Sequence, residues 1–214
     1  MASRTLVIAT GGTIDSAYDP ALGTPEYVPT PQTSAIPKAL SQLGWRQGID
    51  YDFKRFYHKD SNHLHQSHMQ AIAHYLSEHR DYDKVIITHG TDTMPRNGRT
   101  LHELMQHADA GTTRTIIMCG SMQPLRKLAA DEKAACEDVF LDENHTDALR
   151  NLTLAMRKVG TEKSGVYLTD GDQLHNVFDV EKQREVAQGK VTHAQFVGRV
   201  HPFPNPDIDF ISHT

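Results

Sequence analysis

Short apolar runs that alternate with segments of helical periodicity constrain the fold of this chain more than any other feature of its sequence. Five runs, most of them β-branched and continuously apolar, predict strands at residues 5–9, 53–57, 85–88, 115–119 and 166–169. The segments between them repeat apolar residues at helical spacing: Met69, Ile72, Ala73 and Leu76; Leu101, Leu104, Met105 and Ala108; Leu149, Leu152, Ala155 and Met156. We therefore expect an α/β fold, a Rossmann-like three-layer sandwich whose sheet is mostly parallel.

The length of 214 residues favours a single domain with one sizeable core. We expect this domain to span residues 1–198, with an insertion at about 126–145 and a tail at 199–214. The insertion is interpreted as an amphipathic helix with a linker or, preferably, as a solvated surface segment without chemistry. Residues 15–33 carry four prolines and predict a long loop, in the manner of a mobile lid, over the end of the first strand.

The charge, the apolar stretches and the cysteine count of the chain bear on which classes of protein it can belong to. A formal charge of -5 without a basic run gives no indication of nucleic-acid binding. No apolar stretch approaches the roughly 20 residues of a membrane span, and the N-terminus lacks the layout of a signal peptide, so we expect a cytoplasmic protein. Cys119 and Cys136 are too few for a disulfide framework and are interpreted as free thiols.

Three of the predicted strands end in short turns that carry small or hydroxyl-bearing residues. The first is followed by Gly11, Gly12 and Thr13; the third runs into the segment 88–93 (Thr-His-Gly-Thr-Asp-Thr); the fourth runs into the segment 120–122 (Gly-Ser-Met). Each turn alone has an ordinary interpretation as a turn with a helix cap. Because the carboxyl ends of parallel strands meet at one edge of a sheet, we expect these turns to share a ligand site.

The residues at this edge suit attack on an amide. A threonine hydroxyl needs a base before it becomes an effective nucleophile. A carboxylate such as Asp92 can pair with a buried lysine, and a lysine that is partly neutral can accept a proton from a neighbouring threonine such as Thr91. Backbone N–H groups at the Thr91 turn are placed to stabilise an oxyanion.

The segments 10–14 (Thr-Gly-Gly-Thr-Ile) and 89–94 (His-Gly-Thr-Asp-Thr-Met) together closely resemble the two signature motifs of the bacterial-type L-asparaginase family. The resemblance implies that Thr13 is the acylated nucleophile and that Thr91, Asp92 and a lysine form a second triad. Lys182, in an acidic turn at 176–182 after the strand at 166–169, is the preferred lysine and Lys190 the alternative. A lid tyrosine also assists the nucleophile; Tyr27 is favoured over Tyr18.

The same resemblance implies the remaining substrate contacts. Asp60 and Ser61 match the loop that contacts the α-carboxylate and amine of the substrate, Ser121 lines the pocket beneath it, and Gly12 and Gly90 let backbone groups approach it. The implied reaction converts the side-chain amide of asparagine to aspartate and ammonia through a threonyl acyl-enzyme, with no cofactor, in a homodimer or homotetramer. Full-length members carry a second, C-terminal domain for which this length leaves no room, so the chain resembles the short single-domain members.

Three alternatives compete with this hypothesis. A nucleotide-binding module is disfavoured because the first turn is neither G-x-G-x-x-G nor a phosphate-binding G-K-[ST] loop. A zinc site is suggested by His58, His63, His65 and His68, but their spacing is not diagnostic and we expect solvated histidines at a helix start and no bound metal. A catalytically silent relative, or a hydrolase of glutamine or another amide, is compatible with the same residues.

Overall fold

A six-stranded sheet forms the centre of the protein, for which a computed structural model describes residues 4–18, 34–108, 113–127, 139–140, 146–187 and 190–198. The strand order is β3-β1-β4-β5-β8-β9. These strands are β1 (Thr5–Gly11), β3 (Tyr51–Lys59), β4 (Lys84–Thr88), β5 (Thr115–Cys119), β8 (Gly165–Asp170) and β9 (Gln173–Asn176). Neighbouring strands are parallel except β8 and β9, which are antiparallel. The prediction of a mostly parallel sheet is therefore confirmed.

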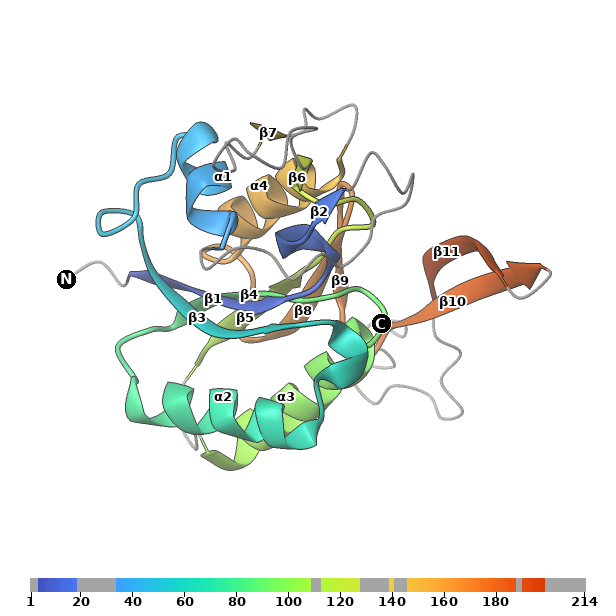
Figure 1. Cartoon of the computed structure of the whole chain (residues 1–214). Coiled ribbons are helices and arrows are strands. Elements are labelled where there is room, and N and C mark those ends of the chain that lie inside the picture. The colour runs from blue at the N-terminus through green and yellow to red at the C-terminus, as the bar shows by residue number, and fades with distance from the viewer. Residues whose placement is uncertain are drawn as a thin grey trace, which may run out of the picture.

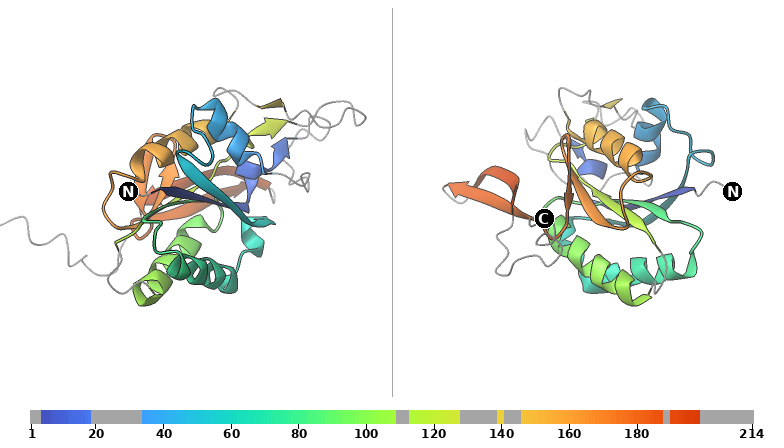
Figure 2. Two further views of the ribbon diagram at one scale, coloured as in Figure 1. Left: turned by 90° about the vertical axis from the view of Figure 1, so that its left-hand side faces the viewer. Right: turned by 180° about the vertical axis from the view of Figure 1, so that it is seen from behind.

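Helices cover both faces of this sheet and complete the three layers. On one side lie α1 (Ile36–Gln42) and α4 (Ala148–Lys158), and on the other lie α2 (Gln66–Glu78) and α3 (Met94–Ala108) (Figures 1 and 2). The apolar stripes predicted from helical spacing are buried in full on α2 and α4. On α3, Leu101 and Met105 are buried, whereas Leu104 and Ala108 are partly exposed. The predicted α/β three-layer sandwich is confirmed.

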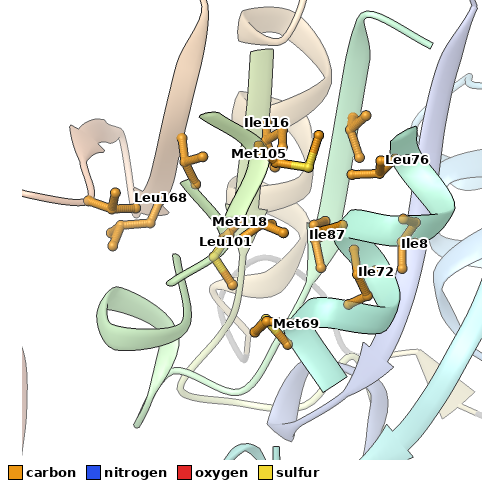
Figure 3. Packing of buried hydrophobic residues seen from close by; sticks show 14 of the residues in the cluster. Ile8, Met69, Ile72, Leu76, Ile87, Leu101, Met105, Ile116, Met118 and Leu168 are labelled. Carbon is orange, nitrogen blue, oxygen red and sulfur yellow. The ribbon is translucent and has the colours of Figure 1, made fainter. Parts of the chain in front are cut away.

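Two aliphatic cores hold the layers together. One lies between α2, α3 and the sheet and includes Ile8, Ile72, Ile87, Leu101 and Met118 (Figure 3). The other lies between α1, α4 and the opposite face of the sheet. All five residues of β5 are buried, because side chains on both faces of an inner parallel strand point into a core. This explains why the inner strands are continuous apolar runs.

Three strands near the C-terminal end of the described chain, β9, β10 and β11, are rich in polar residues and were not predicted. β9 is an antiparallel edge strand, and β10 (Val180–Ala187) pairs with β11 (Lys190–Gly198) in a hairpin that projects from the body (Figure 1). The interpretation of residues 176–182 as an acidic turn is wrong at its end, since Lys182 is the third residue of β10. The hairpin contacts the core through Val180 at the start of β10 and Phe196 of β11, and because few of its positions face a core, it has no continuous apolar run that would predict a strand.

The structure describes only parts of the two predicted surface segments, since residues 19–33 of the loop and residues 128–138 and 141–145 of the insertion lie outside the described residues. The loop predicted at 15–33 begins with a 3-10 turn, η1 (Thr13–Asp15), and a short strand, β2 (Ala17–Tyr18). Arg126, expected at the start of a solvated insertion, is fully buried. It lies in β6 (Arg126–Lys127), which joins β2 and β7 (Val139–Phe140) in a second small sheet.

Cys119 is a free cysteine within β5, and burial raises the pKa of its thiol to about 12. Cys136 lies outside the described residues. Among the helices of the described ranges, none is long and apolar enough to cross a membrane.

Two leucines on α3 give a test of the core. Leu101 is fully buried, whereas Leu104 is partly buried against the same core. We expect Leu101→Ala to lower the free energy of unfolding by about 2–5 kcal/mol, through lost transfer energy and the cavity left behind, and Leu104→Ala to lower it by less. Urea unfolding of both variants measures the difference, and equal losses would contradict the assigned packing.

Candidate active site

The turns that follow β1 and β4 meet through their glycine backbones. A Cβ atom built on Gly12, whose φ is +84°, would lie 2.3 Å from the Gly90 backbone nitrogen and 2.5 Å from its Cα. Gly12 also donates its N–H to the Lys59 carbonyl at the end of β3, at 2.9 Å. Since a side chain at Gly12 would collide with the neighbouring turn, glycine is what allows the Thr13 and Thr91 turns to approach.

Two further segments close in on the Thr91 turn. A Cβ on Gly90 would lie 2.7 Å from the Ser61 Oγ, and a Cβ on Gly120 would lie 2.8 Å from both the His89 carbonyl and the Thr91 Cγ2. The segments after β1, β3, β4 and β5 therefore meet at the carboxyl edge of the sheet. The structure therefore confirms the prediction that these turns meet at one edge of the sheet.

Lys182 reaches this edge from β10. Its Nζ donates to Asp92 Oδ1 at 2.8 Å and forms a shorter hydrogen bond with Thr91 Oγ1. The lysine side chain is 5% exposed and that of Asp92 27% exposed. An ammonium this deeply buried loses most of its hydration, which the carboxylate and the hydroxyl replace. The structure brings Lys182, Asp92 and Thr91 together as the sequence predicts, while their catalytic roles remain predictions.

Met122 also contacts this triad, which the sequence did not indicate. Its Sδ lies 3.6 Å from Lys182 Nζ and 3.7 Å from Thr91 Oγ1. A thioether is a weak acceptor, so it covers the lysine without competing with Asp92 for its charge. A methionine after a glycine and a serine has no distinctive pattern that could have revealed this contact.

The predicted substrate loop is built on a second 3-10 turn, η2 (Ser61–His63). Asp60 caps this turn by accepting from the Asn62 backbone N–H at 2.8 Å and from the Asn62 side-chain amide at 2.9 Å. The same amide lies 3.4 Å from Asp92 Oδ2. Asn62 therefore joins the carboxylate of the loop to the carboxylate of the triad.

The buried ring of His89 holds the Thr91 turn in place through hydrogen bonds to Gly90 and Asn97. The ring is fully buried; its Nδ1 lies 2.7 Å from the Gly90 carbonyl oxygen, and its Nε2 lies 3.0 Å from the Asn97 side-chain amide. Burial lowers the pKa of His89 to about 4, against a small opposing effect of the Gly90 hydrogen bond. The ring is thus neutral near pH 7, and donation from Nδ1 to Gly90 with acceptance at Nε2 satisfies both nitrogens.

Asp147 and Asn151 hold the Ser121 turn, and sequence reasoning missed both. The Asp147 carboxylate accepts from the backbone N–H of Met122 at 2.9 Å and of Gln123 at 3.0 Å, and the Asn151 amide donates to the Gly120 carbonyl at 2.8 Å. An aspartate just before α4 has the pattern of an ordinary helix cap, yet it makes no capping hydrogen bond. The Ser121 hydroxyl donates to the Gln123 carbonyl at 2.6 Å.

The structure leaves the tyrosine prediction open. Thr13 begins η1, and its carbonyl accepts from the Ser16 N–H at 3.1 Å and from the Ser16 hydroxyl at 2.8 Å. Tyr27 lies outside the described residues. The backbone of Tyr18 pairs with Lys127 in the small sheet.

The histidines near η2 support the start of α2. His65 is the N-cap of this helix, and its backbone N–H donates to His68 Nδ1 at 3.0 Å in a reciprocal capping arrangement. Within the described ranges, no group of three or more histidine, cysteine, aspartate or glutamate side chains is arranged to hold a metal ion. The geometry gives the zinc alternative no support.

The protein is an α/β sandwich in which the turns that carry Thr13 and Thr91 meet, and Lys182 contacts Asp92 and Thr91. Comparisons with known proteins identify its family. The model of the asparaginase N-terminal domain matches residues 4–138. A probable L-asparaginase from Deinococcus radiodurans is 32% identical over 130 residues, which are 60% of this chain and 35% of that protein. The chain belongs to the asparaginase family.

Solved structures share the fold. A probable cytoplasmic L-asparaginase from Campylobacter jejuni superposes with a TM-score of 0.62 at 21% identity, over 86% of this chain and 51% of that one. L-asparaginase I from Vibrio cholerae gives 0.58 at 22% identity over 94% and 53% of the two chains. The thermostable L-asparaginase from Thermococcus kodakarensis gives 0.57 at 22% identity over 95% and 58%. The matched region thus spans little more than half of each solved relative.

A pair of glycines tests the close approach of the turns. Gly12 and Gly44 have nearly the same φ, +84° and +89°, but nothing lies within 4 Å of a Cβ on Gly44. We expect Gly44→Ala to lower the free energy of unfolding by about 1 kcal/mol, from backbone strain alone. Gly12→Ala adds the collision with Gly90 and should lower it by about 3 kcal/mol or more. Urea unfolding compares them, and similar losses would refute the contact.

The buried ring of His89 predicts an acid-sensitive term in stability. Its pKa falls from 6.5 in the unfolded chain to about 4 in the folded protein, so the unfolded state takes up a proton first as the pH falls. This term lowers the free energy of unfolding between pH 6.5 and about 4, by up to about 3 kcal/mol. Urea unfolding across this range should give a shallower pH dependence for His89→Asn than for wild type. His74→Asn, at an exposed ring, should retain the wild-type slope; equal slopes for all three proteins would contradict the prediction.

Proposed function

We propose that the protein is an amidohydrolase that cleaves the side-chain amide of asparagine to aspartate and ammonia. The observation that carries the proposal is the contact of the buried Lys182 ammonium group with Asp92 and Thr91. A lysine, a carboxylate and a hydroxyl in mutual contact can move a proton to and from a nucleophile. Family membership supports the same class of reaction.

The proposed mechanism has two half-reactions. In the first, Thr13 Oγ forms a bond to the side-chain amide carbon, its proton passes to the leaving nitrogen, and ammonia departs to leave a threonyl ester. In the second, a water molecule attacks the ester carbon and the Thr13 hydroxyl re-forms as aspartate is released. Thr91 and Lys182 carry the protons, Asp92 balances the lysine charge, and Tyr27 is the proposed partner of Thr13. Neither half-reaction requires a cofactor.

Substrate binding is assigned to the groups around the two threonine turns. Asp60 and Ser61 are proposed to contact the α-amine and α-carboxylate, with Ser121 beneath the substrate. The convergence of Gly12 and Gly90 supports the approach of backbone N–H groups to the reacting carbonyl, where one well-aimed donor is worth about 3 kcal/mol in the transition state. Assembly as a homodimer or homotetramer is part of the proposal.

Lysine variants on one hairpin test the assignment. Lys190 pairs with Ala187 at the far end of the hairpin from Lys182. We expect Thr13→Ala and Lys182→Met to lower kcat by about a thousandfold or more, because a reacting group or its proton relay is lost. Lys190→Met should retain wild-type kcat. Ammonia release is measured with asparagine, glutamine, D-asparagine and a peptide-linked amide.

The outcomes separate the alternatives. If the protein released ammonia from glutamine and little from asparagine, the substrate would be glutamine and the proposal of asparagine would be wrong. A loss below about tenfold in Thr13→Ala would remove this residue from the role of nucleophile. A folded wild-type protein that releases ammonia from none of these substrates would favour the catalytically silent alternative.

A further inference from the structure

A second set of charged groups lies next to the predicted nucleophile, and the proposed reaction does not use it. Asp15 is the last residue of η1, two positions after Thr13, and its side chain is fully buried. A carboxylate enclosed this completely is strongly disfavoured unless neighbouring groups compensate for its lost hydration. The contacts of Asp15 therefore indicate what this residue is for.

The Asp15 carboxylate is bonded to the start of α1. Oδ1 accepts from the Ala35 backbone N–H at 2.7 Å, and the Ser34 side chain forms a further hydrogen bond to the same carboxylate. Ser34 Oγ in turn accepts from the Ile36 N–H at 3.2 Å. Asp15 thus ties the Thr13 turn to a helix that is anchored in the core by Ile36.

Arg126 approaches Asp15 from another part of the chain. Its side chain is fully buried, and its Nη2 lies 3.4 Å from the Asp15 carbonyl oxygen. Burial raises the pKa of the Asp15 carboxyl, whereas the hydrogen bonds from Ala35 and Ser34 and the charge of Arg126 act in the opposite direction and favour the carboxylate. The pairing of Ala17 with Arg126, and a hydrogen bond from the Leu125 N–H to the Ile14 carbonyl at 3.4 Å, fix the backbones of the two segments side by side. Because a guanidinium stays protonated, its burial also calls for a negative partner.

The Thr13 turn depends on such outside contacts. η1 has three residues, and Gly12 at its N-cap has no side chain that could cap it, so a 3-10 turn this short has little stability of its own. Gly12 is held on one side by the Lys59 carbonyl. Asp15 holds the other end, so Thr13 lies between two anchored positions.

We propose that Asp15 and Arg126 form a buried charged clamp that fixes the Thr13 turn and acts as a positioning pair for this threonine. The inference rests on the proposed function for its catalytic consequence, but the clamp itself is a property of the turn. Small displacements of a reacting group can lower a rate by about a hundredfold. Loss of the clamp should therefore reduce kcat more than it changes KM.

Charge-removing variants of matched size test the clamp. Asp15→Asn can still accept from Ala35 but lacks the charge; Arg126→Met keeps the length without the charge; the double variant restores charge balance. Arg114→Met is the control, since Arg114 is a buried arginine just before β5, at the opposite edge of the sheet, where it donates to the Tyr82 and Leu76 carbonyls. All variants are assayed for ammonia release and for hydrogen–deuterium exchange in residues 11–18.

We expect each single clamp variant to lower kcat by about tenfold or more and the double variant to lose less than the product of the two, because the sites are coupled. Exchange in residues 11–18 should be faster in Asp15→Asn than in wild type. Arg114→Met should lower stability while its kcat and its exchange in residues 11–18 stay close to wild type. In the inactive Thr13→Ala background, Asp15→Asn should cause no further loss of residual activity.

Unchanged exchange in residues 11–18 of a folded Asp15→Asn, or a kcat equal to that of wild type, would overturn the clamp. If Asp15→Asn does not fold, the charge-balanced double variant and Arg126→Met replace it, and the same two quantities, kcat and exchange in residues 11–18, decide whether the clamp exists. If the wild-type protein releases no ammonia, the proposed function fails, and the exchange measurement alone then accepts or rejects the clamp.

Discussion

The close contact between the backbones of Gly12 and Gly90 is the constraint on which the rest of the site depends. A parallel sheet brings the ends of β1 and β4 to one edge, but side chains at these two positions would keep the turns apart. Glycine removes that obstacle, so the turns that carry Thr13 and Thr91 lie against each other. The parallel sheet aligns the ends of the two strands, and the absence of Cβ atoms at Gly12 and Gly90 lets the two backbones come into contact.

The helix α3 connects the two halves of the Lys182 site. It begins at Met94, two residues after Asp92, and Arg99 on its second turn donates to the carbonyls of Val177 and Val180 at 3.0 and 3.2 Å. Val180 is the first residue of β10, two residues before Lys182, and Val177 lies three residues before Val180. One helix therefore positions both the carboxylate and the lysine that it pairs with, although they lie 90 positions apart in the sequence.

The sequence predicted those parts of the molecule whose residues have one dominant role. Inner strands such as β4 and β5 are buried on both faces, and this leaves a continuous apolar run. Strands that meet a core at only a few positions, such as β10 and β11, carry no such pattern and were missed. The same holds in the site: the two threonine turns form a recognisable pair of motifs, whereas Asp147 has the pattern of a helix cap and Arg126 that of a surface residue. Their partners are distant in sequence, so only the folded chain reveals their roles.

Charge is buried at the carboxyl edge of the sheet at a cost to stability. An ion removed from water loses several kcal/mol of hydration free energy, which a single partner repays only in part. One fully buried aliphatic side chain contributes about 1.5–3 kcal/mol, so several residues of the two cores are needed to offset Lys182 and Arg126 together. Well-packed apolar residues would stabilise the same positions at least as well. Stability therefore does not explain why these ions are buried, whereas the proposed proton transfer at Lys182 and the proposed clamp at Arg126 each give the buried group a purpose.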